Sequence, residues 1–124
     1  MTWERLGIRQ RDFQATVTDH GRRVRLSGNA DGAAVAAFGG LVDDIHKAHD
    51  RFAGDAVTID LHELEFMSAS CFKVLVGWIA QIQDLEPGAR YRLCFRANPG
   101  IAWQARSLRT LTCFATDLIS VVPA

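Results

Sequence analysis

The sequence has no excess of charge of either sign and no long apolar run. Fourteen basic residues balance fourteen acidic ones, so the formal net charge is zero. A protein without net charge has no long-range field that recruits nucleic acid or an anionic lipid surface, and any partner must be recognised through local contacts. No stretch approaches the roughly 20 apolar residues that span a bilayer, so we expect no membrane insertion.

Cysteine is scarce as well, and processing signals are missing. Cys71, Cys94 and Cys113 are odd in number and lack the spacing of metal ligands. They therefore predict reduced thiols rather than a disulfide framework or a metal site. The N-terminal segment MTWERLGIRQRDF has no apolar core of signal-peptide length, and no Ser, Gln or Pro tract marks a disordered arm. These absences predict a cytoplasmic protein.

The residues that are present have the proportions of a globular domain. Hydrophobic residues make up 48% of the chain and charged residues 23%, which is ordinary for such a protein. A chain of 124 residues falls in the size range of one domain and buries roughly two-thirds of its unfolded surface. We expect a single domain over residues 1–124, without an internal repeat or linker.

The spacing of apolar residues in the first half of the chain predicts two strands, a helix and a third strand. Alternation over residues 13–17 and 24–26, on either side of the turn DHG at residues 19–21, predicts a β-hairpin. Asp31 is a candidate N-cap, and apolar residues at helical spacing predict a helix over residues 32–52. The segment AVTIDL then predicts a short central strand.

The second half of the chain repeats the alternation of helix and strand. After Ser68, an apolar stripe predicts a helix that ends before the breaker EPG at residues 86–88. The segment RYRLCFR predicts a strand, Asn98 and Pro99 predict the N-cap and first residue of a third helix, and LISVV predicts a last strand. The order β-β-α-β-α-β-α-β gives an α/β fold class, with helices packed on a mixed sheet through right-handed parallel crossovers.

This order and two local motifs resemble the STAS domain, the family of anti-sigma factor antagonists and sulfate-transporter cytoplasmic domains. Family members run a strand that ends in Asp-Leu, a short turn, and an Asp-Ser-Ser-Gly-Leu signature that opens the second helix. The matching text here is IDLHELEFMSASCFKVL, residues 59–75. The segment SGNADG is similar to the family's Gly-Glu-Leu-Asp turn. This match places Gly28 at the glycine and Asp31 at the acidic residue that often contacts a partner.

The signature is altered in this chain. Ser68 stands at its Asp, Ala69 at the first Ser, Ser70 at the second Ser or Thr, Cys71 at the Gly and Phe72 at the Leu. In family members that switch partners, a kinase phosphorylates the first Ser. The resemblance therefore implies that the usual phospho-acceptor is absent here, because Ala69 has no hydroxyl.

The function that the resemblance implies is a non-enzymatic protein-interaction module of bacterial partner-switching signalling, which regulates transcription. The implied partner is an ATPase-fold anti-sigma kinase or a related regulator. The module itself is expected to need no cofactor or metal, and the sequence does not set its oligomeric state. The implied partner-binding residues are Asp31, Ser68, Ala69, Ser70, Cys71 and Lys73. The family also suggests an alternative, a small cytoplasmic subunit that docks on an ABC transporter ATPase and does not require the serine.

The start of the second predicted helix allows two interpretations of its serines. A phosphate there would meet unpaired N–H groups and the positive end of the helix dipole, so Ser68 or Ser70 is a candidate for phosphorylation in a shifted kinase register. In the other interpretation Ser68 caps the helix, which contributes about 1 kcal/mol, and Ser70 occupies its first turn.

Cys71 and His62 raise the possibility of an enzyme. A thiol near a helix N-terminus can have a lowered pKa and act as a nucleophile, with the histidine in the preceding turn as the base. In the alternative interpretation Cys71 takes the place of a small glycine at a tight contact between helix and sheet. We favour this second interpretation and predict that the protein is not an enzyme.

Two further groups of residues have a binding interpretation and a structural one. His46 and His49 are three residues apart on the first predicted helix and could hold a metal, or they belong to a solvated face together with neighbouring aspartates. Arginines on the fourth predicted strand and third predicted helix could bind an anion or an acidic partner, or form a solvated face. These arginines are Arg90, Arg92, Arg96, Arg106 and Arg109.

Overall fold

The first three strands form an antiparallel unit at one edge of the sheet. In the computed structural model, which describes residues 3–123, β1 (Ile8–Arg9), β2 (Phe13–Thr18) and β3 (Arg23–Ala30) pair in chain order. The turn between β2 and β3 places Asp19 and His20 at φ values of 53° and 54°, a region where these two residue types are enriched. The predicted hairpin is confirmed, and β1 is added to it.

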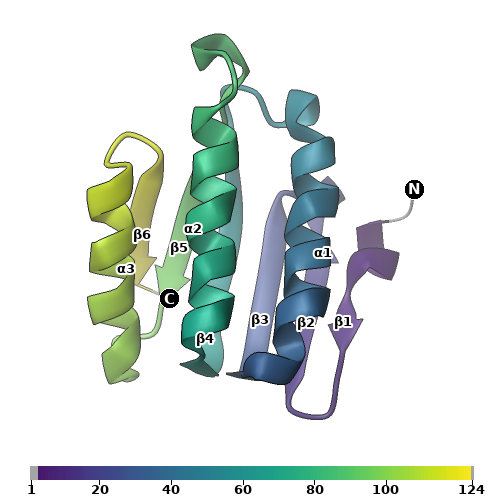
Figure 1. Cartoon of the computed structure of the whole chain (residues 1–124), viewed down its shortest axis with the longest axis vertical. Coiled ribbons are helices and arrows are strands. Elements are labelled where there is room, and N and C mark those ends of the chain that lie inside the picture. Colours follow the sequence, from purple (N-terminus) through teal and green to yellow (C-terminus); the bar gives the residue numbers. More distant parts are fainter. Residues whose placement is uncertain (1–2, 124) are drawn as a thin grey trace.

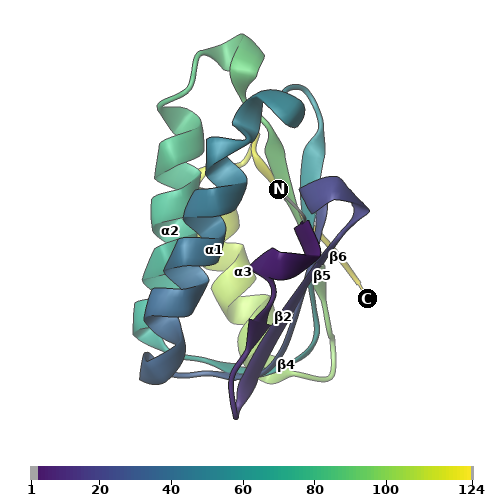
Figure 2. The same ribbon diagram turned by 90° about the vertical axis from the view of Figure 1, so that its right-hand side faces the viewer.

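Three crossovers complete the sheet. The remaining elements are α1 (Val35–Lys47), β4 (Ala56–Met67), α2 (Ala69–Gln83), β5 (Arg92–Ala97), α3 (Ala102–Phe114) and β6 (Ile119–Pro123). Each of the last three strands pairs parallel to the strand before it, so the order in space is β1-β2-β3-β4-β5-β6. All three helices cover the same face of this sheet (Figures 1 and 2). The predicted α/β class with a mixed sheet is confirmed.

The apolar core lies between the sheet and the helices. Alternate residues of the strands turn their side chains to this layer, and the helices contribute apolar stripes such as Phe38 and Ile45 on α1, each 1% exposed. Full burial of a side chain of this size stabilises the fold by about 1.5–3 kcal/mol. None of the helices within residues 3–123 has the length and apolar character to span a bilayer.

No helix of residues 3–123 covers the opposite face of the sheet (Figure 2), and most side chains on this face are polar. The register aligns one row of residues across it, namely Thr16, Arg25, Asp60, Arg96 and Val122. Asp60 accepts a hydrogen bond from Arg23 at 3.5 Å, and Arg25 pairs with Glu63. The open face is therefore arginine-rich, with its acidic groups concentrated on β4.

β4 differs from the prediction, which ended this strand near residue 61 and placed a turn after it. The strand instead continues to Met67, because two register shifts against β3 each insert one extra residue into β4. The buried side chain of Gln104 donates to the carbonyl oxygens of Leu61 and Leu64 at 2.7 and 2.9 Å. One helix side chain thus satisfies backbone groups at the irregular end of the strand.

Two helix boundaries also differ from the predictions. α1 is shorter than the predicted helix, because 3-10 turns at Gly32–Ala34 and His49–Arg51 flank it. α3 begins at Ala102 with Ile101 as its N-cap residue, so the N-cap predicted at Asn98 was wrong. The Asn98 side chain accepts from the N–H of Gly100 at 2.8 Å and closes a local turn instead.

Candidate functional site

The start of α2 is capped by Ser68. Its Oγ accepts a hydrogen bond from the N–H of Cys71 at 3.2 Å, and its own N–H donates to the carbonyl oxygen of Ala30 at 2.7 Å. The first bond satisfies one of the free donors of the helix, and the second ties this helix end to the end of β3. The predicted capping role of Ser68 is confirmed.

Three of the residues implied by the resemblance are exposed on the first turns of α2. Ala69 and Ser70 are the first two residues of the helix, and Lys73 lies one turn after Ala69 on the same side. Ser70 is therefore the exposed hydroxyl of this turn, whereas Ser68 uses its own in the cap.

Asp31 lies beside this helix end. Its Oδ1 accepts from the N–H of Ala33 at 2.9 Å, so it caps the short 3-10 turn before α1. Its carbonyl oxygen accepts the S–H of Cys71 at 3.4 Å, which places the chain around Asp31 against the start of α2. The fold thus brings together two motifs that are 40 residues apart in the sequence.

Cys71 lies beneath the exposed residues at the start of α2. The residue is 0% exposed, so it cannot form part of a contact surface, contrary to its place among the implied partner-binding residues. Burial raises the pKa of its thiol above the ordinary value, and the nearby Asp31 charge adds to this, against an opposing hydrogen bond with Ser68. A raised pKa disfavours the reactive thiolate. Cys71 therefore has the structural role of a small residue between helix and sheet.

His62 does not complete a catalytic pair with Cys71. It is exposed and lines a separate polar hollow of about 620 Å³ at the end of the sheet, a hollow that does not include Cys71. The carbonyl oxygen of His62 accepts from Asn98 at 2.8 Å. The geometry therefore places the two residues of the enzyme hypothesis in different environments.

A shallow hollow of about 410 Å³ lies between the start of α2 and α3. Its lining consists of Met67, Ser68, Ala69, Phe72, Lys73, Arg106, Ser107 and Thr110. Lys73 and Arg106 each bring a cation, and neither forms a salt bridge in the described part of the chain. Phe66 directly precedes Met67, the first of these lining residues in the sequence, and its side chain is 47% exposed. Arg106 was not expected at this position, because only the packing of α3 against α2 brings it there.

His46 and His49 belong to an aromatic network rather than to a solvated face. Trp78 Nε1 donates to the Tyr91 hydroxyl at 2.7 Å, and the same hydroxyl lies 2.7 Å from His46 Nδ1. The Tyr91 hydroxyl is buried, and His46 Nδ1 is its one acceptor among the described residues, because the indole can only donate. The hydroxyl therefore gives its proton to His46, which is neutral with its proton on Nε2. Burial lowers the pKa of His46 and raises that of Tyr91 to about 12.

Both histidines also form hydrogen bonds within the fold. His49 Nδ1 lies 3.0 Å from the carbonyl oxygen of His46, and both rings are half-buried. Within residues 3–123, no group of three His, Cys, Asp or Glu side chains is placed to hold a metal ion. The predicted solvated face is restricted to the exposed Asp43 and Asp50.

Comparison with known proteins identifies the fold. The crystal structure of an anti-sigma factor antagonist from Mycobacterium paratuberculosis matches with a TM-score of 0.61 and 19% sequence identity, over 90% of this chain and 86% of that chain. No protein-family model matches the chain. No match is found among the curated proteins. The chain has a STAS-like fold, in agreement with the resemblance carried by its altered signature.

Proposed function

We propose that this chain is a single-domain, non-enzymatic interaction module that acts like an anti-sigma factor antagonist and binds a regulatory protein through the start of α2. The observation that carries the proposal is the grouping of two distant motifs around one capped helix end on a STAS-like fold. The α2 surface is defined here as Asp31, Ser68, Ala69, Ser70 and Lys73, with Cys71 beneath it. The partner is an ATPase-fold anti-sigma kinase or a related regulator of bacterial transcription in the cytoplasm.

The surroundings of the α2 surface support a protein partner. Phe66 exposes a large apolar side chain, and the half-buried Phe72 lies in the adjacent hollow. Aromatic anchors of this kind contribute much of the binding energy of protein interfaces. Lys73 and Arg106 add positive charge at the same place, which favours a partner with acidic side chains and raises the rate of association.

The hydroxyls at the helix start support a module that is permanently competent to bind. Ala69 cannot accept a phosphate, and the Ser68 hydroxyl is held in the cap by the N–H of Cys71. Ser70 is exposed, but it stands one residue after the acceptor position of the family. Regulation in this proposal therefore acts through the partner, and protein purified from its native cell should carry no stoichiometric phosphate on Ser68 or Ser70.

Affinity capture from native cell lysate tests the proposal. Tagged wild type is compared with Lys73→Glu and with Lys47→Glu, a control on α1 whose side chain is 77% exposed. Mass spectrometry should identify an ATPase-fold kinase that binds wild type and the control but not Lys73→Glu. Recovery of transporter ATPase subunits would instead support the docking role in a transporter, and retention of the kinase by Lys73→Glu would contradict the assignment of the α2 surface.

A further inference from the structure

The two edges of the sheet differ in how well they are protected against added strands. β1 is only two residues long and ends in Arg9, whereas β6 has five residues and no charged side chain. No strand of residues 3–123 pairs with the outer edge of β6. Short edge strands, charges and prolines block unwanted pairing. On β6 the one such feature is Pro123, at the end of the strand.

The pairing of β6 with β5 determines which backbone N–H and C=O groups lie on the outer edge of β6. Leu93 is aligned with Ile119, and its N–H donates to the carbonyl oxygen of Leu118 at 2.8 Å. In a parallel ladder alternate residues turn their backbone to the same neighbour, so Leu118 and Ser120 face β5 and Ile119 and Val121 face outward.

Val121 is the central outward-facing residue of this edge. The N–H of Ile119 is already used, because it donates to the carbonyl oxygen of Ala115 at 3.1 Å. Pro123 has no N–H. Val121 therefore offers both a donor and an acceptor at the edge, which is the pair of groups that an added strand requires.

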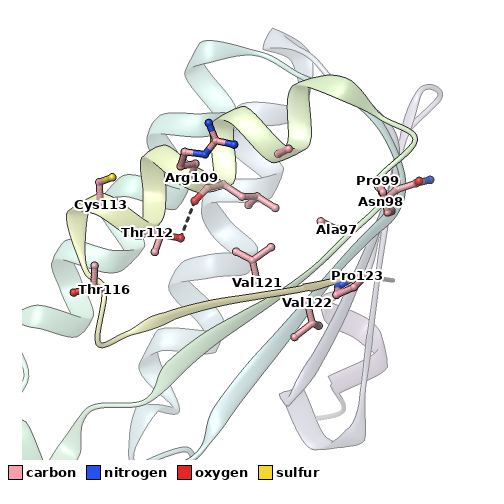
Figure 3. A pocket seen from close by; sticks show the side chains of 12 residues that line it. Ala97, Asn98, Pro99, Arg109, Thr112, Cys113, Thr116, Val121, Val122 and Pro123 are labelled. Atoms are coloured by element: carbon pink, nitrogen blue, oxygen red, sulfur yellow. Dashed lines mark hydrogen bonds between the residues drawn. The ribbon is translucent and has the colours of Figure 1, made fainter.

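An apolar groove runs beside this edge, between α3 and β6 (Figure 3). Its volume is about 450 Å³, and its lining includes Leu108, Thr112 and Val121. Figure 3 shows the Val121 side chain pointing from β6 toward α3, with Val122 on the other side of the strand. Both valines are exposed, at 42% and 40%. A strand added to β6 would place every second side chain in this groove.

The open face of the sheet supplies a charge next to the same edge. Arg96 lies between Asp60 and Val122 in its row, but Asp60 is engaged by Arg23, and Arg96 forms no salt bridge in the described part of the chain. A residue added beside Val122 would be two strand spacings, about 9.6 Å, from the Arg96 backbone. The extended side chains of arginine and glutamate can meet across the short valine at this distance.

We propose that β6 and the α3–β6 groove bind an extended segment of a partner protein as a seventh strand of the sheet. The side chains of this segment alternate, with apolar residues in the groove beside Val121 and acidic residues beside Val122, within reach of Arg96. A second copy of this chain fits less well, because its β6 would bring only Ser120 and Val122 to the open face and leave Arg96 without a negative partner. This interface does not depend on the α2 surface.

The test uses the full chain and a capped seven-residue peptide, Val-Glu-Val-Glu-Val-Glu-Val. A peptide with lysine at the glutamate positions is the matched control. Binding is followed by NMR titration and by hydrogen exchange at the Val121 amide. With peptide at about ten times its Kd, exchange at Val121 should slow about tenfold, and the glutamate peptide should bind at least about tenfold more tightly than the lysine peptide.

Two substitutions on β5 test the charge assignment. Arg96→Glu should reverse the preference between the two peptides, whereas Arg92→Glu, on the same face of the strand but aligned with no residue of β6, should preserve it. Val121→Lys should weaken both peptides about tenfold, with the fold checked by circular dichroism. An unchanged preference in Arg96→Glu would overturn the charge assignment.

Two other occupants are distinguishable in the same experiment. NMR chemical-shift changes on α3 without slower amide hydrogen exchange at Val121 would mean that the groove binds apolar groups alone. This result would overturn strand addition. Protection of Val121 that rises with protein concentration in the absence of peptide, together with a dimer mass in sedimentation, would assign the edge to a second copy and overturn the proposal.

Discussion

The Tyr91 hydroxyl lies 2.7 Å from His46 Nδ1, across a contact between residues 45 positions apart in the sequence. The hydroxyl also accepts from Trp78, and His46 Nδ1 is its one acceptor among the described residues, so this buried group donates to a neutral histidine. A single hydroxyl thus links α1, α2 and the residue just before β5. Protonation of His46 at Nδ1 would break this arrangement, since both ring nitrogens would then be donors.

The free energy of unfolding should therefore fall as the pH is lowered through the range just below 6.5. Burial and the neighbouring His49 lower the pKa of His46 from the ordinary value of 6.5, so the unfolded chain binds the proton first. The stabilisation is complete above that value and is lost as the pH falls toward the lowered native pKa. Urea unfolding between pH 5 and pH 8, at intervals of about half a unit, should show this slope.

The controls for this pH dependence are two histidine substitutions. His46→Gln should flatten the slope, whereas His20→Asn, at an exposed turn residue with φ of 54°, should leave it unchanged. Equal slopes in wild type and His46→Gln would show that the histidine is not the group responsible.

Removal of the α2 cap should destabilise the fold. Ser68→Ala removes the acceptor for the Cys71 N–H and should lower the free energy of unfolding by about 1 kcal/mol. Ser70→Ala should change it by less than about 0.5 kcal/mol, because Ser70 is exposed and caps nothing. Denaturant titration of both variants measures the difference, and similar effects for the two serines would contradict the capping geometry.

Cys71 and Cys113 should differ sharply in their reaction with iodoacetamide. Cys113 is exposed and should react at the rate of a model thiol, whereas Cys71 is buried with a raised pKa and should react only after unfolding. Peptide mapping after timed labelling gives both rates in the same sample, so Cys113 serves as the internal control. Rapid labelling of Cys71 in the folded protein would revive its interpretation as a nucleophile.

A negative charge at the family's acceptor position should prevent partner binding without unfolding the protein. Ala69→Glu places a carboxylate in the first turn of α2, where the helix dipole favours it, so the melting temperature should change little. The same charge should repel the acidic partner expected at the α2 surface. Ala80→Glu, exposed near the other end of α2, is the control and should still bind. Equal binding of both variants would argue against the assigned surface.

The elements that could be predicted from the sequence are those whose signals are local. Ser68 was correctly predicted as a cap, because a serine before an apolar helical stripe needs no information from elsewhere in the chain. The match of Gly28 to the family's glycine agrees with the structure, since its φ is 88° and an added Cβ would collide with the carbonyl oxygen of Asp12 across the hairpin.

The features that could not be predicted depend on pairing between distant segments. The extension of β4 rests on register shifts against β3 and on the side chain of Gln104, 40 residues beyond Leu64. The position of His46 rests on Tyr91, and that of Arg106 at the α2 surface rests on helix packing. Each of these contacts joins separate elements, and a periodic pattern along the chain contains no information about them.

The order of the strands in space is also their order along the chain. Every strand therefore pairs with a strand already made, and no strand must wait for a later one to be inserted between two others. During synthesis the sheet can grow in one direction, by one crossover at a time, as the polypeptide emerges. Of the six strands, β6 is added last, so its outer edge, which no strand of residues 3–123 covers, is the newest edge of the sheet.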